Sequence, residues 1–379
     1  MPRPTHSQSS PKLLSRHSNP NRCSWSVAGS SLNTWCRLPG NPLTRPLVLM
    51  ANRPDAKNAT VCFRPAELPP GIDTFTAFFR SSRDPAYDHL QKVLLRVVDG
   101  DARVRARSTL RLARGARAQA TLHFEDSAPD PALEIELALE GFDGGNHHGN
   151  LRLSYLLAYR SNPMVTMCNA AGTDKGTETY SGNGFPHCYA LQYHELFNSF
   201  RDERFSLLEI GLDDASKETG KPADAPSLRV WRDYFPAADL FGYDLHDFTG
   251  FEQERTVTFQ GDQGSRADLD RFIARYDGQE FRIVIDDGSH ASSHQQTSLA
   301  ALFRQVEPGG MYIIEDLGWQ PYPEEPRTLD VLLQAGRGGR VRSPFIPDAE
   351  ARYLEQTVAA VEVHQPNDSP FAVIRKQPG

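Results

Sequence analysis

Two carboxylates and two histidines follow an apolar segment in the stretch RIVIDDGSHASSHQQ, residues 282–296. Asp286 and Asp287 end the predicted strand, and His290 and His294 have the spacing of one face of a helix. Carboxylates bind hard cations, and an imidazole, whose ordinary pKa is near neutrality, suits a general base. This combination predicts proton transfer beside a metal ion at the end of a strand.

The elements that position these side chains belong to a region of alternating strands and helices after Arg160. Apolar runs predict buried strands over 205–211, 239–246, 256–263, 281–287 and 311–316. Predicted helices cover 189–200, 227–235, 266–276 and 294–306. Repeated strand–helix units predict an α/β fold with a mostly parallel, doubly wound sheet. Residues 358–376 are predicted to add two further strands as an antiparallel edge.

Polar residues end all five of these predicted strands. In an open parallel sheet, ligands bind outside the carboxyl ends of the strands, near the point where the strand order reverses. A single polar strand end is ordinary turn chemistry, but five together predict a ligand site. The residues are Glu209, Asp244, Asp262, Gln263, Asp286, Asp287, Glu315 and Asp316.

The second and third strand ends indicate an adenosine-containing cofactor. Asp244 could accept hydrogen bonds from both ribose hydroxyls, and Asp262 and Gln263 could bind the adenine amino edge. Asp286 is assigned to the same cofactor-binding group. The first strand leads into EIGLDD instead of the GxGxxG expected for NAD, GRGGR at 336–340 does not follow a strand, and there is no P-loop. A cofactor without a pyrophosphate, S-adenosylmethionine, therefore fits better.

The fourth and fifth strand ends carry three carboxylates that would repel one another without a cation. Asp287, Glu315 and Asp316 are therefore predicted to bind Mg²⁺ or Mn²⁺. His290 could then take the proton of an alcohol, which a metal makes easier to remove. The alternative for His290 is an N-cap or packing role at the start of the next helix. We interpret His294 as a packing residue.

Residues 55–160 show a period of two, which is typical of half-buried strands. Apolar and polar residues alternate over 104–112, 118–124, 133–139 and 151–157, with turn signals between these segments. The pattern predicts an antiparallel β-sandwich-like accessory domain. Arg103, Arg105 and Arg107 are interpreted as a solvated strand face, with an anion site as the alternative. His147 and His148 are interpreted as a surface turn, with a metal site as the alternative.

Residues 1–54 are rich in Ser, Pro, Asn and Arg and are predicted to be a disordered tail. They hold seven of the 41 Lys and Arg residues and none of the 48 Asp and Glu residues, so the remaining chain is strongly acidic. An acidic body of this kind makes nucleic acid an unexpected partner. The segment could also be a transit peptide, or an upstream extension with Met50 as the start.

Composition narrows the class of protein further. No apolar run approaches the length needed to cross a bilayer, so no membrane partner is expected. The five cysteines are scattered and lack CxxC spacing, which indicates neither a zinc site nor a disulfide framework. We therefore expect a cytoplasmic protein with a small-molecule or glycan partner, and a homo-oligomer is left open.

Five ordered motifs within residues 170–320 resemble the metal-dependent sugar O-methyltransferases of macrolide antibiotic biosynthesis. They are GTDKGTETY…HCYALQYHELF, LLEIG…SLRVWRDYFPAADLFGYDLHD, TFQGDQ, IVIDDGSH and PGGMYIIEDL. The resemblance implies a Rossmann-like class I S-adenosylmethionine-dependent methyltransferase domain over 161–379. It also implies a sugar hydroxyl of a glycosylated natural product or glycan as the methyl acceptor.

The resemblance implies a role for each motif residue. Asp287 with Glu315 or Asp316 would bind Mg²⁺, and His290 would take the proton from the sugar hydroxyl. The loop GTDKG, residues 172–176, would close over the site. The residues around the cofactor would be Glu209, Gly211, Asp244, Asp262 and Gln263.

The chain departs from the family pattern after the first strand. Gly211 is kept, but the glycines that should follow are replaced in EIGLDDASKETGKPADAPSL, and glycine there lets backbone approach the cofactor. Asp213, Asp214 or Pro226 could obstruct binding. The alternative function is therefore a degenerate methyltransferase-like protein that binds a glycan or partner. A metal-dependent hydrolase would leave Asp244 without a task.

Overall fold

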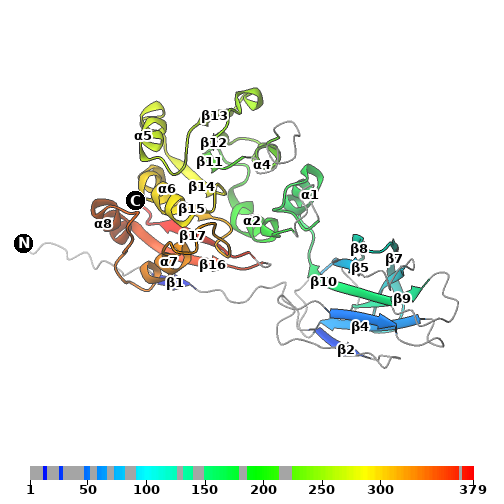
Figure 1. Cartoon of the computed structure of the whole chain (residues 1–379). Helices are drawn as coiled ribbons and strands as arrows, with labels where there is room; N and C mark the ends of the chain where they lie inside the picture. Colours follow the sequence, from blue (N-terminus) through cyan, green and yellow to red (C-terminus); the bar gives the residue numbers. More distant parts are fainter. Residues whose placement is uncertain are drawn as a thin grey trace, which may run out of the picture. The chain divides into compact units, whose positions relative to one another are not determined.

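The computed structural model describes residues 12–14, 25–28, 47–51, 58–65, 72–81, 91–125, 131–139, 149–178, 186–212, 224–366 and 369–379. The chain forms two compact units (Figure 1). Residues 1–19 and 163–379 make the first unit, and residues 20–162 make the second. Every residue of the predicted site belongs to the first unit.

The first unit is built on an eight-stranded sheet in the order β1-β16-β17-β15-β14-β11-β12-β13. Strands β11 to β15 run parallel, and β17 runs antiparallel to β15 and β16. The strand order reverses between β11 and β14. This arrangement confirms the predicted doubly wound α/β sheet. The strand bounds are β1 Lys12–Leu14, β11 Ser206–Ile210, β12 Asp239–Asp244, β13 Thr256–Gln260, β14 Phe281–Asp286, β15 Val306–Ile314, β16 Val358–His364 and β17 Phe371–Lys376.

Helices cover both faces of this sheet (Figure 1). The segment boundaries follow local signals, since α4 begins with Pro226 and Ser265 caps α5 by accepting the N–H of Asp268. No helix was predicted for the segments that form α1, α7 and α8. The bounds are α1 Pro163–Ala171, α2 Tyr189–Phe197, α4 Pro226–Tyr234, α5 Arg266–Arg275, α6 Ser292–Leu302, α7 Thr328–Gly336 and α8 Asp348–Thr357.

One strand differs from the sequence prediction in where it begins. Strand β15 begins at Val306 instead of Met311, so the Pro308-Gly309-Gly310 signal lies inside the strand. Gly309 has φ +80°, and the pairing with β14 shifts register near this point, because glycine accommodates the bulge. The two strands predicted over 358–376 are confirmed as β16 and β17, which extend the sheet antiparallel beyond β15, and the unpredicted β1 pairs outside them.

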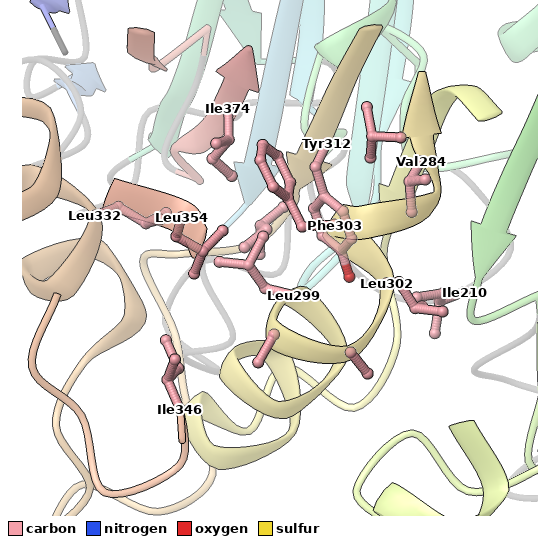
Figure 2. Close-up of a cluster of buried hydrophobic side chains, with 14 of the residues drawn as sticks. Ile210, Val284, Leu299, Leu302, Phe303, Tyr312, Leu332, Ile346, Leu354 and Ile374 are labelled. Atoms are coloured by element: carbon pink, nitrogen blue, oxygen red, sulfur yellow. The ribbon is translucent and has the colours of Figure 1, made fainter. Parts of the chain in front are cut away.

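One buried cluster joins the sheet to α5, α6, α7 and α8 (Figure 2). Leu299, Leu302 and Phe303 pack beside Val284 of β14 and Tyr312 of β15. Each of these side chains is at most 2% exposed. Burial of an aliphatic or aromatic side chain of this size contributes roughly 1.5–3 kcal/mol to folding. The cluster therefore fixes β14 and β15, whose ends carry most of the candidate site.

The second unit contains two antiparallel sheets, ordered β3-β10-β5-β8 and β2-β4-β9-β6-β7. Alternate residues of both sheets, such as Phe75, Phe79, Val93, Leu95 and Ile135, form one buried cluster. The strand bounds are β2 Trp25–Ala28, β3 Leu47–Ala51, β4 Asn58–Pro65, β5 Thr74–Ser81, β6 Gln91–Val98, β7 Val104–Leu112, β8 Arg117–His123, β9 Ala132–Leu139 and β10 Gly149–Tyr159.

Several predictions for the N-terminal half need correction or lie outside the described residues. Val104 was predicted to be half-buried but is 53% exposed, because β7 is the last strand of its sheet. Arg105 pairs with the buried Asp99 at 2.6 Å and so has a local partner. Within residues 1–54, the predicted tail, the structure describes β1, β2 and β3, each of which pairs with another strand. His147 and His148 lie outside the described residues.

Within the described parts of the chain, no helix combines the length and the apolar character that crossing a membrane requires.

Candidate active site

The loops after β11 and β14 meet where the strand order reverses. Gly211 follows β11 with φ +87°, and a Cβ atom there would lie 2.2 Å from the carbonyl oxygen of Asp287. The N–H of Asp287 donates to the carbonyl of Ile210 at 2.8 Å. Only glycine permits this close approach. Gly211 therefore brings the predicted cofactor loop against the predicted metal-binding loop.

Asp244 ends β12 and holds the chain that follows β11. One carboxylate oxygen accepts the N–H of Leu212 and the other accepts the N–H of His246, each at 2.8 Å. Asp244 is 7% exposed, whereas the next residue, Leu245, is 58% exposed. Asp244 thus links the first two strand ends, where a nucleotide ribose binds in sheets of this kind.

Gln263, which follows β13, is held by Asp286 at the end of β14. Its amide nitrogen donates to Asp286 at 2.6 Å, and its amide oxygen accepts the N–H of Ser289 at 3.1 Å. Asp286 is fully buried and also accepts the hydroxyls of Ser298 at 2.6 Å and Tyr312 at 3.2 Å. The burial raises the pKa of Asp286, and these donors oppose the rise. Asp286 therefore positions Gln263, and its contact with a cofactor stays a prediction.

Asp262 and His294 lie at the border of the site. Asp262 is exposed, and its carboxylate accepts the N–H of Gly264 at 2.8 Å. His294 forms a hydrogen bond with Ser289 Oγ at 2.8 Å, and a Cβ atom at Gly264 would lie 2.4 Å from its Nε2. His294 therefore packs against the turn after β13, as its predicted packing role requires.

Glu209 lies inside β11 and is fully buried. One oxygen accepts the Ser227 hydroxyl at 2.8 Å, while the other has no hydrogen-bond partner and lies 3.9 Å from Lys175 Nζ. Burial raises the pKa of Glu209 to about 7, although Lys175 opposes the rise. That oxygen makes no hydrogen bond and lies 3.9 Å from an ammonium, so a cationic or N–H-bearing ligand could still bind it.

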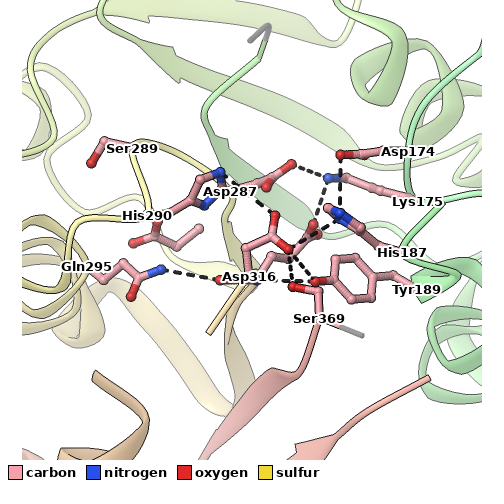
Figure 3. A network of polar contacts seen from close by, with 12 residues as sticks. Asp174, Lys175, His187, Tyr189, Asp287, Ser289, His290, Gln295, Asp316 and Ser369 are labelled. Atoms are coloured by element: carbon pink, nitrogen blue, oxygen red, sulfur yellow. Dashed lines mark hydrogen bonds and ion pairs between the residues drawn. The ribbon is translucent and has the colours of Figure 1, made fainter. Parts of the chain in front are cut away.

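Asp287, His290 and Asp316 gather where β14 and β15 end (Figure 3). One potential ligand atom from each residue lies within 4.8 Å of the other two. His290 Nε2 is 3.8 Å from a carboxylate oxygen of Asp316, and its buried Nδ1 has no hydrogen-bond partner. The structure thus groups the predicted base with two of the three predicted metal ligands.

The backbone is strained at two of these three residues. His290 and Asp316 have φ +58° and +54°. The left-handed region costs a non-glycine residue roughly 1–2 kcal/mol, and such conformations cluster at functional sites. The alternative N-cap role for His290 does not hold, because Ala291 occupies the N-cap of α6.

Asp316 is the centre of a hydrogen-bond network that sequence reasoning did not predict. It accepts the Tyr189 hydroxyl at 2.8 Å and the Ser369 hydroxyl, and His187 Nδ1 lies 3.3 Å away (Figure 3). Burial opposes ionisation of Asp316. The imidazoles of His187 and His290 and the two hydroxyl donors outweigh burial, so its pKa lies below the ordinary value.

Lys175, in the loop GTDKG, contacts the carboxylates at the ends of β14 and β15. Its ammonium is 2.8 Å from a carboxylate oxygen of Glu315 and also pairs with Asp287. The second oxygen of Glu315 accepts the Tyr193 hydroxyl at 2.6 Å. Burial raises the pKa of Glu315 well above its usual value and that of Asp287 to about 6, and Lys175 opposes both rises. Glu315 therefore faces Lys175 and stands apart from the cluster of potential metal ligands.

The loop that departs from the family pattern is only partly visible. Asp213 and Asp214 lie in the segment 213–223, outside the described residues. Pro226 forms the first turn of α4, where its missing N–H is tolerated. The presence of a proline at position 226 is therefore explained by the start of α4, and its obstruction of the cofactor stays a prediction.

Comparison with known proteins covers part of the chain. No family model matches the sequence. Mycinamicin VI 2''-O-methyltransferase of Micromonospora griseorubida is 41% identical over 193 residues, which are 48% of this chain and 47% of that protein. Demethylmacrocin O-methyltransferase of Streptomyces fradiae is 40% identical over 140 residues, 37% of this chain and 34% of that protein. This chain resembles sugar O-methyltransferases.

The resemblance inferred from the five motifs is thus confirmed, and it concerns part of each protein. The chain spans half or less of the length of these curated relatives. Among solved structures, the MycE methyltransferase from the mycinamycin biosynthetic pathway, in complex with Mg and SAH, is 30% identical with a TM-score of 0.46. That match covers 58% of this chain and 55% of the solved chain.

Proposed function

We propose that the protein is an S-adenosylmethionine- and Mg²⁺-dependent O-methyltransferase that acts on a sugar hydroxyl of a glycosylated small molecule. The observation that carries the proposal is the gathering of Asp287, His290 and Asp316 beside the point where the strand order reverses. A methyl donor at the cofactor loops and an acceptor beside His290 would meet there. Two curated relatives are named mycinamicin VI 2''-O-methyltransferase and demethylmacrocin O-methyltransferase.

The donor atoms present fit both small partners. Asp287 and Asp316 would hold a divalent ion, because their carboxylate oxygens are the ligands that Mg²⁺ prefers. Glu209, Gly211, Asp244 and Gln263 would hold S-adenosylmethionine. The oxygen of Glu209 that has no hydrogen-bond partner would accept a hydrogen bond from one donor group of that cofactor. When bound, the cofactor supplies an electrophilic methyl group and the ion supplies positive charge beside the acceptor oxygen.

The protein's own residues would manage the acceptor proton. A ring nitrogen of His290 would take the proton, and Nε2 lies 3.8 Å from a carboxylate oxygen of Asp316. The Asp316 carboxylate would stabilise the resulting imidazolium and keep the ring in one orientation. Tyr189 and Ser369 hold Asp316 in place through their hydroxyls.

The acceptor side is indicated by an exposed aromatic residue. Trp319 is 58% exposed, and its ring meets the His290 ring edge-on at 5.8 Å. Its loop is fixed to the start of α6, where Gln320 accepts the Ser292 hydroxyl at 2.5 Å and Glu325 accepts the N–H of Ser293 at 2.8 Å. An exposed ring on an anchored loop is suited to packing against a sugar or the apolar part of a glycoside.

The test is a methyl-transfer screen of the full chain against glycosides, with radiolabelled S-adenosylmethionine and with or without Mg²⁺. We expect transfer that EDTA abolishes, and a loss of at least about 100-fold in His290→Ala, because a positioned base typically contributes that factor. Asp287→Asn should be as inactive and should not regain activity with excess Mg²⁺. Glu280→Gln, an exposed site outside the cluster, is the control. Turnover near wild type in both site variants would refute the proposal.

The proposal includes a cytoplasmic location for the protein. Cys168 is a buried cysteine with a free thiol. Free thiols are compatible with the reducing cytoplasm that the scattered cysteine pattern predicts.

A further inference from the structure

Lys175 is a fully buried cation among several carboxylates. The residue is 1% exposed, and its ammonium pairs with Asp287, lies 2.8 Å from Glu315 and lies 3.9 Å from Glu209. Within the described ranges, no other lysine or arginine is within ion-pair distance of these three side chains. Three carboxylates around one ammonium are the arrangement in which a buried lysine keeps its charge.

The backbone keeps this ammonium from moving away. The carbonyl of Lys175 accepts the N–H of Ala190 in the first turn of α2 at 2.9 Å. The next residue, Gly176, accepts the N–H of Cys188 at 3.0 Å, and Asp174 accepts the N–H of His187 at 2.7 Å. The loop GTDKG is therefore tied to the start of α2 on either side of Lys175.

The pairing divides the carboxylates into two groups. Lys175 and Tyr193 engage both oxygens of Glu315, and Lys175 engages one oxygen of Asp287. The remaining potential ligand atoms belong to the cluster of Asp287, His290 and Asp316. A cation that is part of the chain thus stands on one side of Asp287, and the candidate metal site lies on the other (Figure 3).

We propose that Lys175 is a fixed internal counter-ion of the metal site. Its ammonium occupies the position between Asp287 and Glu315 where a second divalent ion could otherwise bind. It therefore limits the site to one divalent ion and lowers the affinity of the site for that ion. The affinity of such a site for a cation depends on the charge and number of its oxygen ligands. The positive charge of Lys175 lies close to the site in a buried, poorly screened environment, so it repels the divalent ion strongly. Only the identity of the ion rests on the proposed function.

The experiment measures Mn²⁺ binding to the full chain by calorimetry and by electron paramagnetic resonance, without S-adenosylmethionine. Lys175→Met keeps the length of the side chain and removes the charge. We expect Lys175→Met to bind Mn²⁺ at least about ten-fold more tightly than wild type, or to bind a second ion. Glu315→Gln should bind it more weakly, since Lys175 is then less neutralised.

The double variant guards against a folding defect. Lys175→Met leaves Glu315 buried without its cation, whereas Lys175→Met/Glu315→Gln removes both charges. We expect the double variant to bind Mn²⁺ at least about ten-fold more tightly than Glu315→Gln alone and within about three-fold of wild type. Thermal unfolding shows which proteins are folded.

The outcomes separate this proposal from the proposed function. Equal or weaker Mn²⁺ binding after removal of Lys175, with no second ion bound, in either background, would overturn the counter-ion role and leave methyl transfer untouched. Tighter binding in a protein whose wild type transfers no methyl group would retain the counter-ion role and refute the proposed reaction.

Discussion

At the scale of single residues, the site combines groups that a strand-end pattern can predict with groups that it cannot. Asp244, Asp287 and Asp316 follow or end apolar runs, so their convergence could be inferred from the sequence. Lys175, which is 112 residues before Asp287 in the chain, and His187 reach the same place from a different part of the sequence. The motif GTDKG was a signal for that loop, but it did not reveal that Lys175 contacts Glu315.

The strained backbone of His290 gives a prediction at this scale. At φ +58° an alanine bears the cost of the left-handed region and a glycine does not. We expect His290→Gly to be as stable as His290→Ala or more stable, by up to about 1 kcal/mol, in urea unfolding. At a position with an ordinary backbone conformation, a glycine variant is less stable than an alanine variant by about 0.5–1 kcal/mol. If His290→Gly were less stable than His290→Ala by this amount, the result would contradict the left-handed conformation of residue 290. Both variants should lose methyl transfer.

At the scale of elements, apolar runs predicted the parallel strands and the helices between them, because buried strands and amphipathic helices carry strong periodic signals. The irregular parts were predicted less well. Pro308-Gly309-Gly310 looked like a turn, whereas the residues form a bulge inside β15. Helices α1, α7 and α8 were not predicted, although they are as long as the predicted α2, α4 and α5, so their length does not explain the difference.

The hairpin of β16 and β17 provides a pH-dependent prediction. Glu362 is 8% exposed, accepts a hydrogen bond from Arg375 at 2.5 Å and lies 3.5 Å from His364. Burial opposes its ionisation, but His364 and Arg375 outweigh burial and lower its pKa to about 2 from an ordinary 4.5. A lowered pKa stabilises the folded state above pH 4.5, and this stabilisation is lost as the pH falls from 4.5 towards 2.

We expect Glu362→Gln to lower the free energy of unfolding by about 1–3 kcal/mol at pH 7. The deficit relative to wild type should shrink as urea unfolding is repeated at pH 5, 4 and 3.5. Glu324→Gln, on the exposed loop after β15, is the matched control and should change stability little at any pH. A deficit that stays constant with pH would contradict the lowered pKa of Glu362.

At the scale of the whole molecule, the central claim is that a methyl donor and a divalent ion share one pocket beside His290. The loops that would hold them are in direct contact, since Gly211 lies against the backbone of Asp287. The sequence supported this claim through the order of the strand ends. It could not predict which carboxylates face the ion, because that depends on Lys175 pairing with Glu315.

The most direct measurement is the proton relaxation of the S-methyl group of S-adenosylmethionine on the protein, with Mn²⁺ added as a paramagnetic ion. Wild type should show strong, Mn²⁺-dependent broadening of the methyl resonance that Mg²⁺ reverses by competition, and Asp287→Asn should show little. Broadening in wild type no greater than in Asp287→Asn, with the cofactor bound to both, would contradict a shared pocket. Failure of wild type to bind the cofactor at millimolar concentration would instead favour a degenerate, non-catalytic protein.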